Sequence, residues 1–315
     1  MDQPVHDKLA TLSNALKGVI APALTPFNDD LSVAEDLYLA HAKWLLKDGC
    51  VGLAPFGTTG EALSVGIDER NRMLDLLVDD GIDPAKLIPG TGLTNLPDTV
   101  KLTRKAVDLG CAGAMILPPF YFKNVADEGL YIYFKKLIEM VDRDALRIYL
   151  YHIPQVAGVG FPIEVVQRLR EDFPRQIVGI KDSSGVWENT EALLHIDGLI
   201  VYPGAELPLI EALDLGGPGC ISATANLNAA GIAGVIRAYH AGDRDKAVEL
   251  HEDVKKFRLT MQEYAPIPAQ KRLLAGWGDK RWANVRPPFL AMPEADGQAL
   301  AARLKDEFGI DGLRG

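Results

Sequence analysis

The chain has 315 residues, 48% of them hydrophobic, and a formal net charge of −10 at pH 7. This length and composition suffice for one large core or two ordinary ones. The acidic balance argues against nucleic acid or an anionic membrane surface as a partner, because both favour basic patches. The acidic balance does not argue against a small anionic ligand, since one local pocket can hold it.

Targeting, disulfide and metal signals are weak throughout. The sequence has no stretch of about 18 apolar residues, and its first twenty residues lack an apolar core of signal-peptide length, so we expect no membrane partner. The three cysteines, Cys50, Cys111 and Cys220, are far apart and odd in number, which favours a reducing cytoplasm over a disulfide framework. The six histidines form no HxH, HExxH or Cys/His cluster, so no metal site is predicted.

Short apolar runs alternate with longer amphipathic segments along most of the chain. In helix-like segments such as 34–49 and 96–110, apolar residues recur every three or four positions and charges fill the opposite face. Several of the apolar runs are nearly continuous, as expected for strands covered on both faces. The runs predicted to be strands are 18–27, 51–57, 86–92, 113–120, 147–154, 177–182, 199–204 and 219–226.

Eight strand–helix units over about 220 residues are typical of a (β/α)₈ barrel. We therefore predict the α/β class, with an N-terminal extension at 1–16, a (β/α)₈ TIM barrel at 17–240 and a C-terminal helical region at 241–315. A doubly wound sheet is the alternative architecture. Its glycine fingerprint has only one weak candidate, "GTGLTN" at 90–95, which lacks the third glycine.

The segment "IVGIKDSSG" (177–185) ends an apolar strand with a lysine, Lys181. In a barrel this strand end lies at the active-site face. Burying an ammonium group is costly unless it is paired or gives up its proton. A neutral amine there can attack a carbonyl carbon and form an imine. The alternative is a strand-end lysine paired with Asp182 or another carboxylate.

The segment "GTTGE", Gly57 to Glu61, forms a glycine-flanked turn before a predicted helix. The hydroxyls of Thr58 and Thr59 and several backbone N–H groups make a suitable cradle for a carboxylate. An ordinary strand-to-helix loop with threonine capping is the alternative reading. A phosphate loop is not indicated, because GxxxxGK[ST] is absent.

Tyr151 lies in "RIYLYHIP" (147–154), where strand periodicity places Tyr149 on its side and His152 on the other. Near an imine-forming lysine, Tyr151 could act as a general acid and base. A buried tyrosine that only hydrogen-bonds into the core is the alternative. We expect His152 to be a packed or supporting residue.

Together, "GTTGE", a strand ending in Tyr-x-x-Pro, and "GIKDSSG" at these separations resemble the dihydrodipicolinate synthase and N-acetylneuraminate lyase family. That family comprises class I, Schiff-base (β/α)₈ lyases acting on pyruvate and other 2-oxo acids. The resemblance extends to "GAELPLIEALDLGGPGCISATAN" (204–226) and to "PIP" and "RPP" near the end, and it covers residues 17–290 approximately.

The resemblance implies roles for individual residues. Lys181 would form the imine and Tyr151 would shuttle protons. Thr58 and Thr59 would hold the carboxylate of the 2-oxo acid, with Thr58 also relaying protons between tyrosines. No cofactor would be needed, because the imine supplies the activation.

Two further positions follow from the same resemblance. Tyr121, in "PPFYF", matches a tyrosine that family members often lend to the site of a neighbouring subunit. The resemblance implies a homotetramer, although a dimer would suffice to exchange Tyr121. Ile221 matches a position whose backbone faces the bound acid.

The sequence also departs from the synthase pattern. The arginine that would grip the carboxylate of aspartate semialdehyde is replaced by Val156, and an acidic pair is changed to Ala205 and Glu206. We therefore predict a lyase or aldolase that forms a lysine Schiff base with pyruvate or another 2-oxo acid and makes or breaks a C–C bond to an aldehyde. The alternatives are a 2-oxo (sugar) acid dehydratase or deaminase, dihydrodipicolinate synthase itself, and a non-catalytic barrel that binds small carboxylates.

Overall fold

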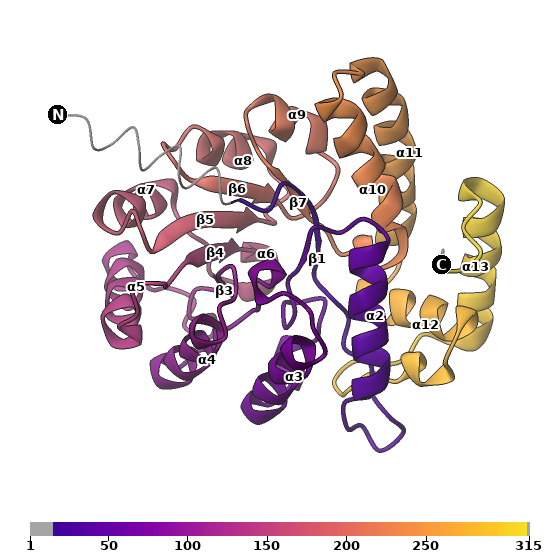
Figure 1. Cartoon of the computed structure of the whole chain (residues 1–315), viewed down its shortest axis with the longest axis horizontal. Coiled ribbons are helices and arrows are strands. Elements are labelled where there is room, and N and C mark those ends of the chain that lie inside the picture. Colours follow the sequence, from indigo (N-terminus) through magenta and orange to yellow (C-terminus); the bar gives the residue numbers. More distant parts are fainter. Residues whose placement is uncertain (1–14, 314–315) are drawn as a thin grey trace. The chain divides into compact units, whose positions relative to one another are not determined.

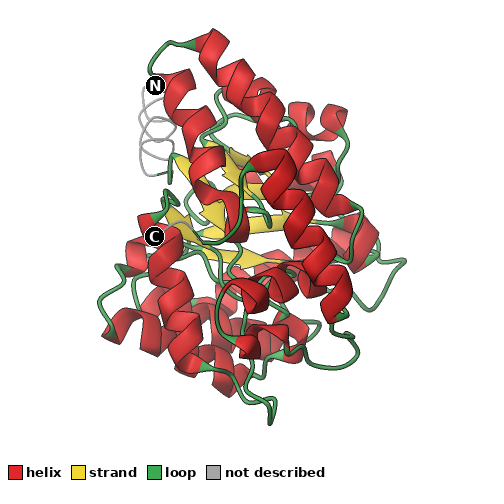
Figure 2. Ribbon diagram, turned by 90° about the vertical axis from the view of Figure 1, so that its right-hand side faces the viewer, coloured by secondary structure: helices red, strands yellow, loops and turns green. Residues whose placement is uncertain are grey.

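The computed structural model describes residues 15–313, which form two compact units. The first unit holds residues 15–18 together with Asp83–Ile221, and the second holds Val19–Ile82 together with residues 222–313. Helices make up most of the regular structure, and the strands are short (Figure 2).

The first unit is built on a parallel sheet in which strands follow one another in chain order. Every residue of its strands is buried, as the continuous apolar runs predict. A further buried strand, β7 (Gly219–Ile221), lies next to β6. The four strands of the sheet are β3 (Ala114–Ile116), β4 (Ile148–His152), β5 (Ile177–Asp182) and β6 (Ile200–Pro203).

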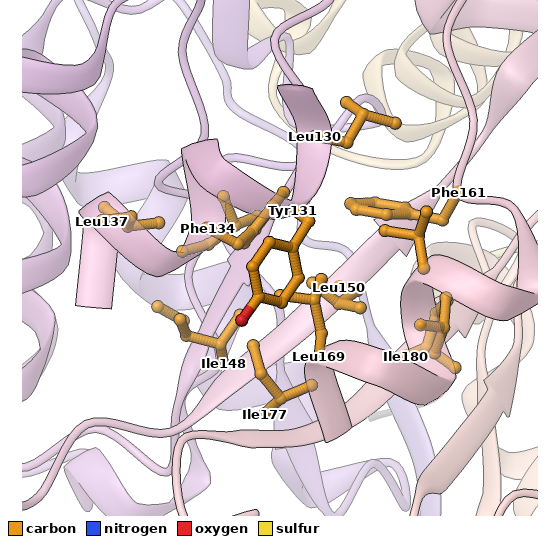
Figure 3. Packing of buried hydrophobic residues seen from close by; sticks show 14 of the residues in the cluster. Leu130, Tyr131, Phe134, Leu137, Ile148, Leu150, Phe161, Leu169, Ile177 and Ile180 are labelled. Atoms are coloured by element: carbon orange, nitrogen blue, oxygen red, sulfur yellow. The ribbon is translucent and has the colours of Figure 1, made fainter. Parts of the chain in front are cut away.

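Helices follow the strands of the first unit, and α4, α5, α7 and α8 lie outside β3 to β6 (Figure 1). In α5, buried residues recur every three or four positions, from Leu130 and Phe134 to Val141, so one face packs on the sheet. Phe134 meets Phe161 in the core beneath (Figure 3), with ring centroids 5.2 Å apart. The helices are α4 (Leu96–Asp108), α5 (Asp127–Val141), α6 (Pro154–Ala157), α7 (Ile163–Asp172), α8 (Trp187–Leu194) and α9 (Leu209–Asp214), with a 3₁₀ turn at Pro84–Lys86.

The second unit pairs β1 (Gly18–Ala21) with β2 (Gly52–Leu53) in parallel and is otherwise helical. The helices predicted beyond residue 240 are present as α11, α12 and α13. Its core contains Phe257, Leu273, Trp282 and Leu304. Its helices are α2 (Glu35–Lys47), α3 (Ile67–Asp79), α10 (Ala225–His240), α11 (Arg244–Gln262), α12 (Pro266–Trp277) and α13 (Glu294–Phe308), with 3₁₀ turns at Ala62–Ser64 and Lys280–Ala283.

The strand predicted at 86–92 is reduced to a single parallel bridge between Gly90 and Met115. Met115 N donates to Pro89 O at 2.8 Å, and Thr91 N donates to Met115 O at 3.0 Å. Pro89 has no N–H to donate, which explains why pairing does not extend further. The strand predicted at 18–27 is also too long, because β1 ends at Ala21, before Pro22 and Pro26.

Candidate active site

Lys181 and Tyr151 come together at adjacent strand ends of the first unit. They are paired in register across β4 and β5, so their side chains share one face of the sheet. Lys181 is only 4% exposed, and its Nζ lies 3.5 Å from Tyr151 Oη and 4.5 Å from the centre of the tyrosine ring. A buried amine therefore lies at the outer limit of a hydrogen bond to a phenol hydroxyl.

Asp182, the next residue on β5, makes its hydrogen bonds with the start of α8. Its Oδ1 accepts from Ser184 N at 2.9 Å, and its Oδ2 accepts from Asn189 Nδ2 at 3.1 Å and from Thr190 Oγ1 at 2.6 Å. Alternation along the strand places its side chain opposite that of Lys181. Asp182 therefore fixes the strand-to-helix turn rather than serving as the counterion of Lys181.

Two further tyrosines, Tyr149 on β4 and Tyr202 on β6, pack against each other in the same sheet. The rings of Tyr149 and Tyr202 lie 6.0 Å apart, and Tyr202 is the register partner of Lys181 on β6. Burial raises the pKa of Tyr149 to about 12 and raises that of Tyr202 well above its usual range. Gly179 permits the packing, since a Cβ there would lie 2.7 Å from the Tyr149 ring. These phenols stay protonated and neutral at physiological pH.

His152 lies on the other side of β4, as predicted. Its Nδ1 accepts a hydrogen bond from Phe161 N at 2.8 Å. Burial lowers its pKa, and the charge of nearby Asp182 only partly opposes this. His152 is thus a neutral residue that holds the segment after β4.

Gly57, Thr58 and Thr59 belong to the second unit, in the loop that follows β2. Gly57 is buried and both threonines are half-buried. The loop closes on itself, because Glu61 N donates to Thr58 O at 3.1 Å and Ala62 N donates to Gly57 O at 3.2 Å. The segment is a tight turn, as the sequence predicts, but it leads into a short 3₁₀ helix, and α3 begins only at Ile67.

The position of Gly60 within this loop leaves no room for a side chain. A Cβ there would lie 2.8 Å from Ala23 O and 3.2 Å from Phe56 N. The carbonyl of Gly60 accepts a buried hydrogen bond from Thr25 Oγ1 at 2.7 Å. The loop therefore lies directly on the segment that follows β1.

A buried ion pair joins Glu61, the last residue of the loop, to Lys271 of α12. This pair was not predicted from the sequence. Lys271 Nζ donates to Glu61 Oε1 at 2.5 Å, and both side chains are completely buried. The two residues are 210 positions apart. The only available signal was a lysine within the apolar part of α12.

The remaining predicted site residues differ in exposure. Tyr121 is 75% exposed and Val156 is 62% exposed, whereas Ile221 is fully buried at the end of β7. Lys123 Nζ donates to the carbonyls of Phe120 and Ala157, so the segments that carry Tyr121 and Val156 lie side by side.

Within residues 15–313, no helix is long and apolar enough to cross a membrane. In the same range, no group of three or more His, Cys, Asp or Glu side chains is arranged to hold a metal ion.

The sequence model of the Dihydrodipicolinate synthetase family matches residues 15–307. An uncharacterized DapA-like lyase of Chloroflexus aurantiacus is 32% identical over 288 residues, which are 91% of this chain and 95% of that protein. The crystal structure of dihydrodipicolinate synthase from Agrobacterium tumefaciens superposes with a TM-score of 0.82 at 32% identity, covering 93% of this chain and 99% of the other.

A second solved structure is similar to the same extent. YagE, a prophage protein of the dihydrodipicolinic acid synthase family from E. coli K12, solved in complex with pyruvate, superposes with a TM-score of 0.84 at 27% identity, covering 92% of this chain and 98% of the other. These similarities confirm the predicted α/β class and the (β/α)₈ TIM barrel with C-terminal helices.

Proposed function

The chain belongs to the dihydrodipicolinate synthetase family, and we propose that it is a lyase in which Lys181 forms a Schiff base with pyruvate or another 2-oxo acid. Membership makes it an enzyme of the lyase and aldolase type. The observation that carries the finer proposal is the buried Lys181 amine, 3.5 Å from Tyr151 Oη, beside an Asp182 carboxylate that is engaged elsewhere.

The proposed reaction begins when the amine nitrogen of Lys181 attacks C2 of the 2-oxo acid. Loss of water from the resulting carbinolamine gives a protonated imine, which withdraws electrons from C3. Tyr151 gives its phenol proton to the hydroxyl that leaves the carbinolamine as water, and so becomes a phenolate. In the cleavage direction, this phenolate accepts the proton of the C4 hydroxyl as the C3–C4 bond breaks, releasing an aldehyde and leaving an enamine. Protonation of the enamine and hydrolysis of the imine then release the acid. The condensation direction reverses these steps, with no metal or organic cofactor.

The GTTGE loop supplies the proposed carboxylate site. Gly57, Thr58 and Thr59 would hold the carboxylate of the 2-oxo acid through hydroxyl and backbone N–H groups, and the backbone at Ile221 would face the same acid. Pyruvate is proposed as this acid because the related protein YagE was solved in complex with it.

We also propose a homotetramer in which Tyr121 completes the site of a neighbouring subunit. Its 75% exposure supports this assignment, because a side chain lent to another copy must project from its own chain. The cytoplasm is the proposed location, because all three cysteines are free thiols. We also propose that the chain is organised as an N-terminal extension (1–16), a (β/α)₈ barrel (17–240) and a C-terminal helical region (241–315).

The second substrate is proposed to be an aldehyde without a carboxylate at the position that Val156 would contact. Val156 replaces the arginine that would hold such a carboxylate, and an arginine from another segment, Arg286, could in principle take its place. Its guanidinium, however, is bound to both oxygens of Glu69 and to the carbonyls of Leu31 and Ser64. Aspartate semialdehyde is therefore not the proposed substrate.

Borohydride trapping tests the proposal. Pyruvate and borohydride should give one irreversible adduct per chain, on the peptide that contains "GIKDSSG". Lys181→Met should abolish the adduct, whereas Lys136→Met, at an exposed lysine of α5 that pairs with Glu139, should not. An adduct on a different lysine, or none in the wild type, would refute the assignment of Lys181.

A further inference from the structure

Glu61 occupies an unusual backbone conformation at the end of the GTTGE loop. Its φ is +53°, a left-handed value that residues other than glycine seldom adopt. Its carboxylate is completely buried, with Oε1 accepting from Lys271 Nζ at 2.5 Å and Oε2 accepting from Arg286 N at 3.3 Å. Both oxygens are therefore tied to the C-terminal part of the second unit.

Lys271 reaches Glu61 from α12. The charged groups that face it are Glu61 and Arg286, and its Nζ also lies 4.4 Å from the centre of the Phe27 ring. Burial lowers the pKa of Lys271 to about 8; the charge of Glu61 opposes the shift, and Arg286 adds to it. The ammonium group keeps its charge at neutral pH because Glu61 is beside it.

The chain that follows Glu61 is fixed separately by arginines. Arg286 Nη1 donates to Ser64 O at 2.5 Å and to Glu69 Oε2 at 2.8 Å. Arg70, which is nearly fully buried, donates through Nε to Val65 O at 3.1 Å. Arg70 Nη2 also donates to Ala62 O, directly after the loop. These arginine bonds lie beyond Glu61, whereas the pair with Lys271 holds Glu61, the last residue of the loop itself.

A buried ion pair is a poor device for stability alone, because desolvating two charges offsets much of their attraction. It does fix geometry, since each partner becomes costly to move away from the other. Here the fixed carboxylate is two residues from Thr59 and three from Thr58, in a loop already held in a strained conformation.

We propose that Glu61 and Lys271 are positioning residues, whose buried ion pair holds the GTTGE loop in the conformation that binds the carboxylate of the 2-oxo acid. This inference rests on the role proposed above for Thr58 and Thr59. It assigns to α12, a helix outside the eight strand–helix units, an influence on substrate affinity that acts through the GTTGE loop.

Lys271→Met tests the pair by removing the charge while keeping much of the side-chain volume. We expect the Kd for pyruvate, measured by titration calorimetry, to rise about 10- to 100-fold, as for loss of a charge-assisted contact. Hydrogen exchange of the peptide covering 56–66 should accelerate in the folded protein. Lys246→Met, in an exposed pair with Glu249 on α11, is the matched control and should change neither quantity.

Glu61→Gln provides a second variant, because glutamine retains the shape of the side chain and an oxygen that accepts from Lys271. It should give a smaller rise in the Kd for pyruvate than Lys271→Met. It also keeps the ion pair testable if Lys271→Met folds poorly. If both variants keep the wild-type Kd for pyruvate and the wild-type hydrogen exchange of residues 56–66, the inference is overturned. This holds whatever the two substitutions do to the free energy of unfolding. Wild-type protein that binds pyruvate without being trapped overturns the assignment of Lys181 alone. Wild-type protein that does not bind pyruvate overturns both.

Discussion

At the scale of single residues, Lys181 and Tyr151 are proposed to perform different tasks, and one substitution separates them. Tyr151→Phe keeps the ring 4.5 Å from Lys181 Nζ but removes the hydroxyl. We expect kcat to fall about 10²- to 10⁴-fold, the usual cost of losing a positioned acid and base. Imine formation should persist in borohydride trapping. Tyr131→Phe is the control, because the Tyr131 hydroxyl donates to Asp172, which is not a proposed site residue. Near-normal turnover of Tyr151→Phe would show that Tyr151 is only a core residue.

Val156 should decide which aldehyde is preferred. A valine provides neither charge nor the two-pronged hydrogen bonding with which arginine holds a carboxylate. In the presence of pyruvate, we expect kcat/KM for uncharged aldehydes to exceed that for aspartate semialdehyde. Val156→Arg should raise the value for aspartate semialdehyde about 10- to 100-fold, the effect of gaining a charge-assisted contact. A tenfold preference of the wild type for aspartate semialdehyde would identify it as a synthase.

At the scale of elements, the loop after β2 depends on the absence of a side chain at Gly60. Gly60→Ala would place a Cβ 2.8 Å from the backbone oxygen of Ala23, so the loop or the segment after β1 must shift. We expect a lower urea midpoint together with weaker pyruvate binding. Gly129→Ala in α5 is the control, because no atom lies within 4 Å of its Cβ and alanine favours the helix. An unchanged pyruvate Kd in Gly60→Ala would show that binding does not need this loop conformation.

Elements with a local signal were predictable from the sequence, and those without one were not. Helical periodicity identified 34–49 and 96–110, which are α2 and α4. The extent of the strand at 86–92 depended on Pro89, which interrupts the hydrogen-bonding ladder that apolar composition alone suggests. The Glu61–Lys271 pair could not be predicted, because contacts between segments 210 residues apart have no local periodicity.

At the scale of the whole molecule, acid stability should depend on one buried histidine of the second unit. His41 Nε2 lies 2.9 Å from Asn226 Oδ1, and its ring packs against Trp44 and Trp282. The Asn226 amide nitrogen donates to Pro22 O at 3.1 Å, so its oxygen is the acceptor and His41 Nε2 carries the proton. His41 Nδ1 has no hydrogen-bond partner in the described part of the chain, so a second proton there would be buried and unsatisfied.

This environment predicts loss of stability in mild acid. Burial lowers the pKa of His41 to about 4, and the bond to Asn226 only partly opposes the shift. As pH falls from about 6.5 to about 4, the unfolded chain binds a proton that the folded chain does not, so the free energy of unfolding decreases. The stabilisation is complete above about pH 6.5, and the loss by pH 4 is on the order of 3 kcal/mol.

Urea unfolding at pH 7 and pH 4.5, followed by tryptophan fluorescence, measures this loss. His41→Gln does not titrate in this range, so its urea midpoint should fall less between the two pH values than that of the wild type. Carboxylates that titrate in the same range remain in both proteins, so the difference between the two falls isolates His41. His195→Gln, at an exposed histidine whose Nδ1 lies 2.8 Å from Glu191 O, should behave like the wild type. An equal fall in His41→Gln and wild type would mean that His41 is not the group whose protonation destabilises the fold.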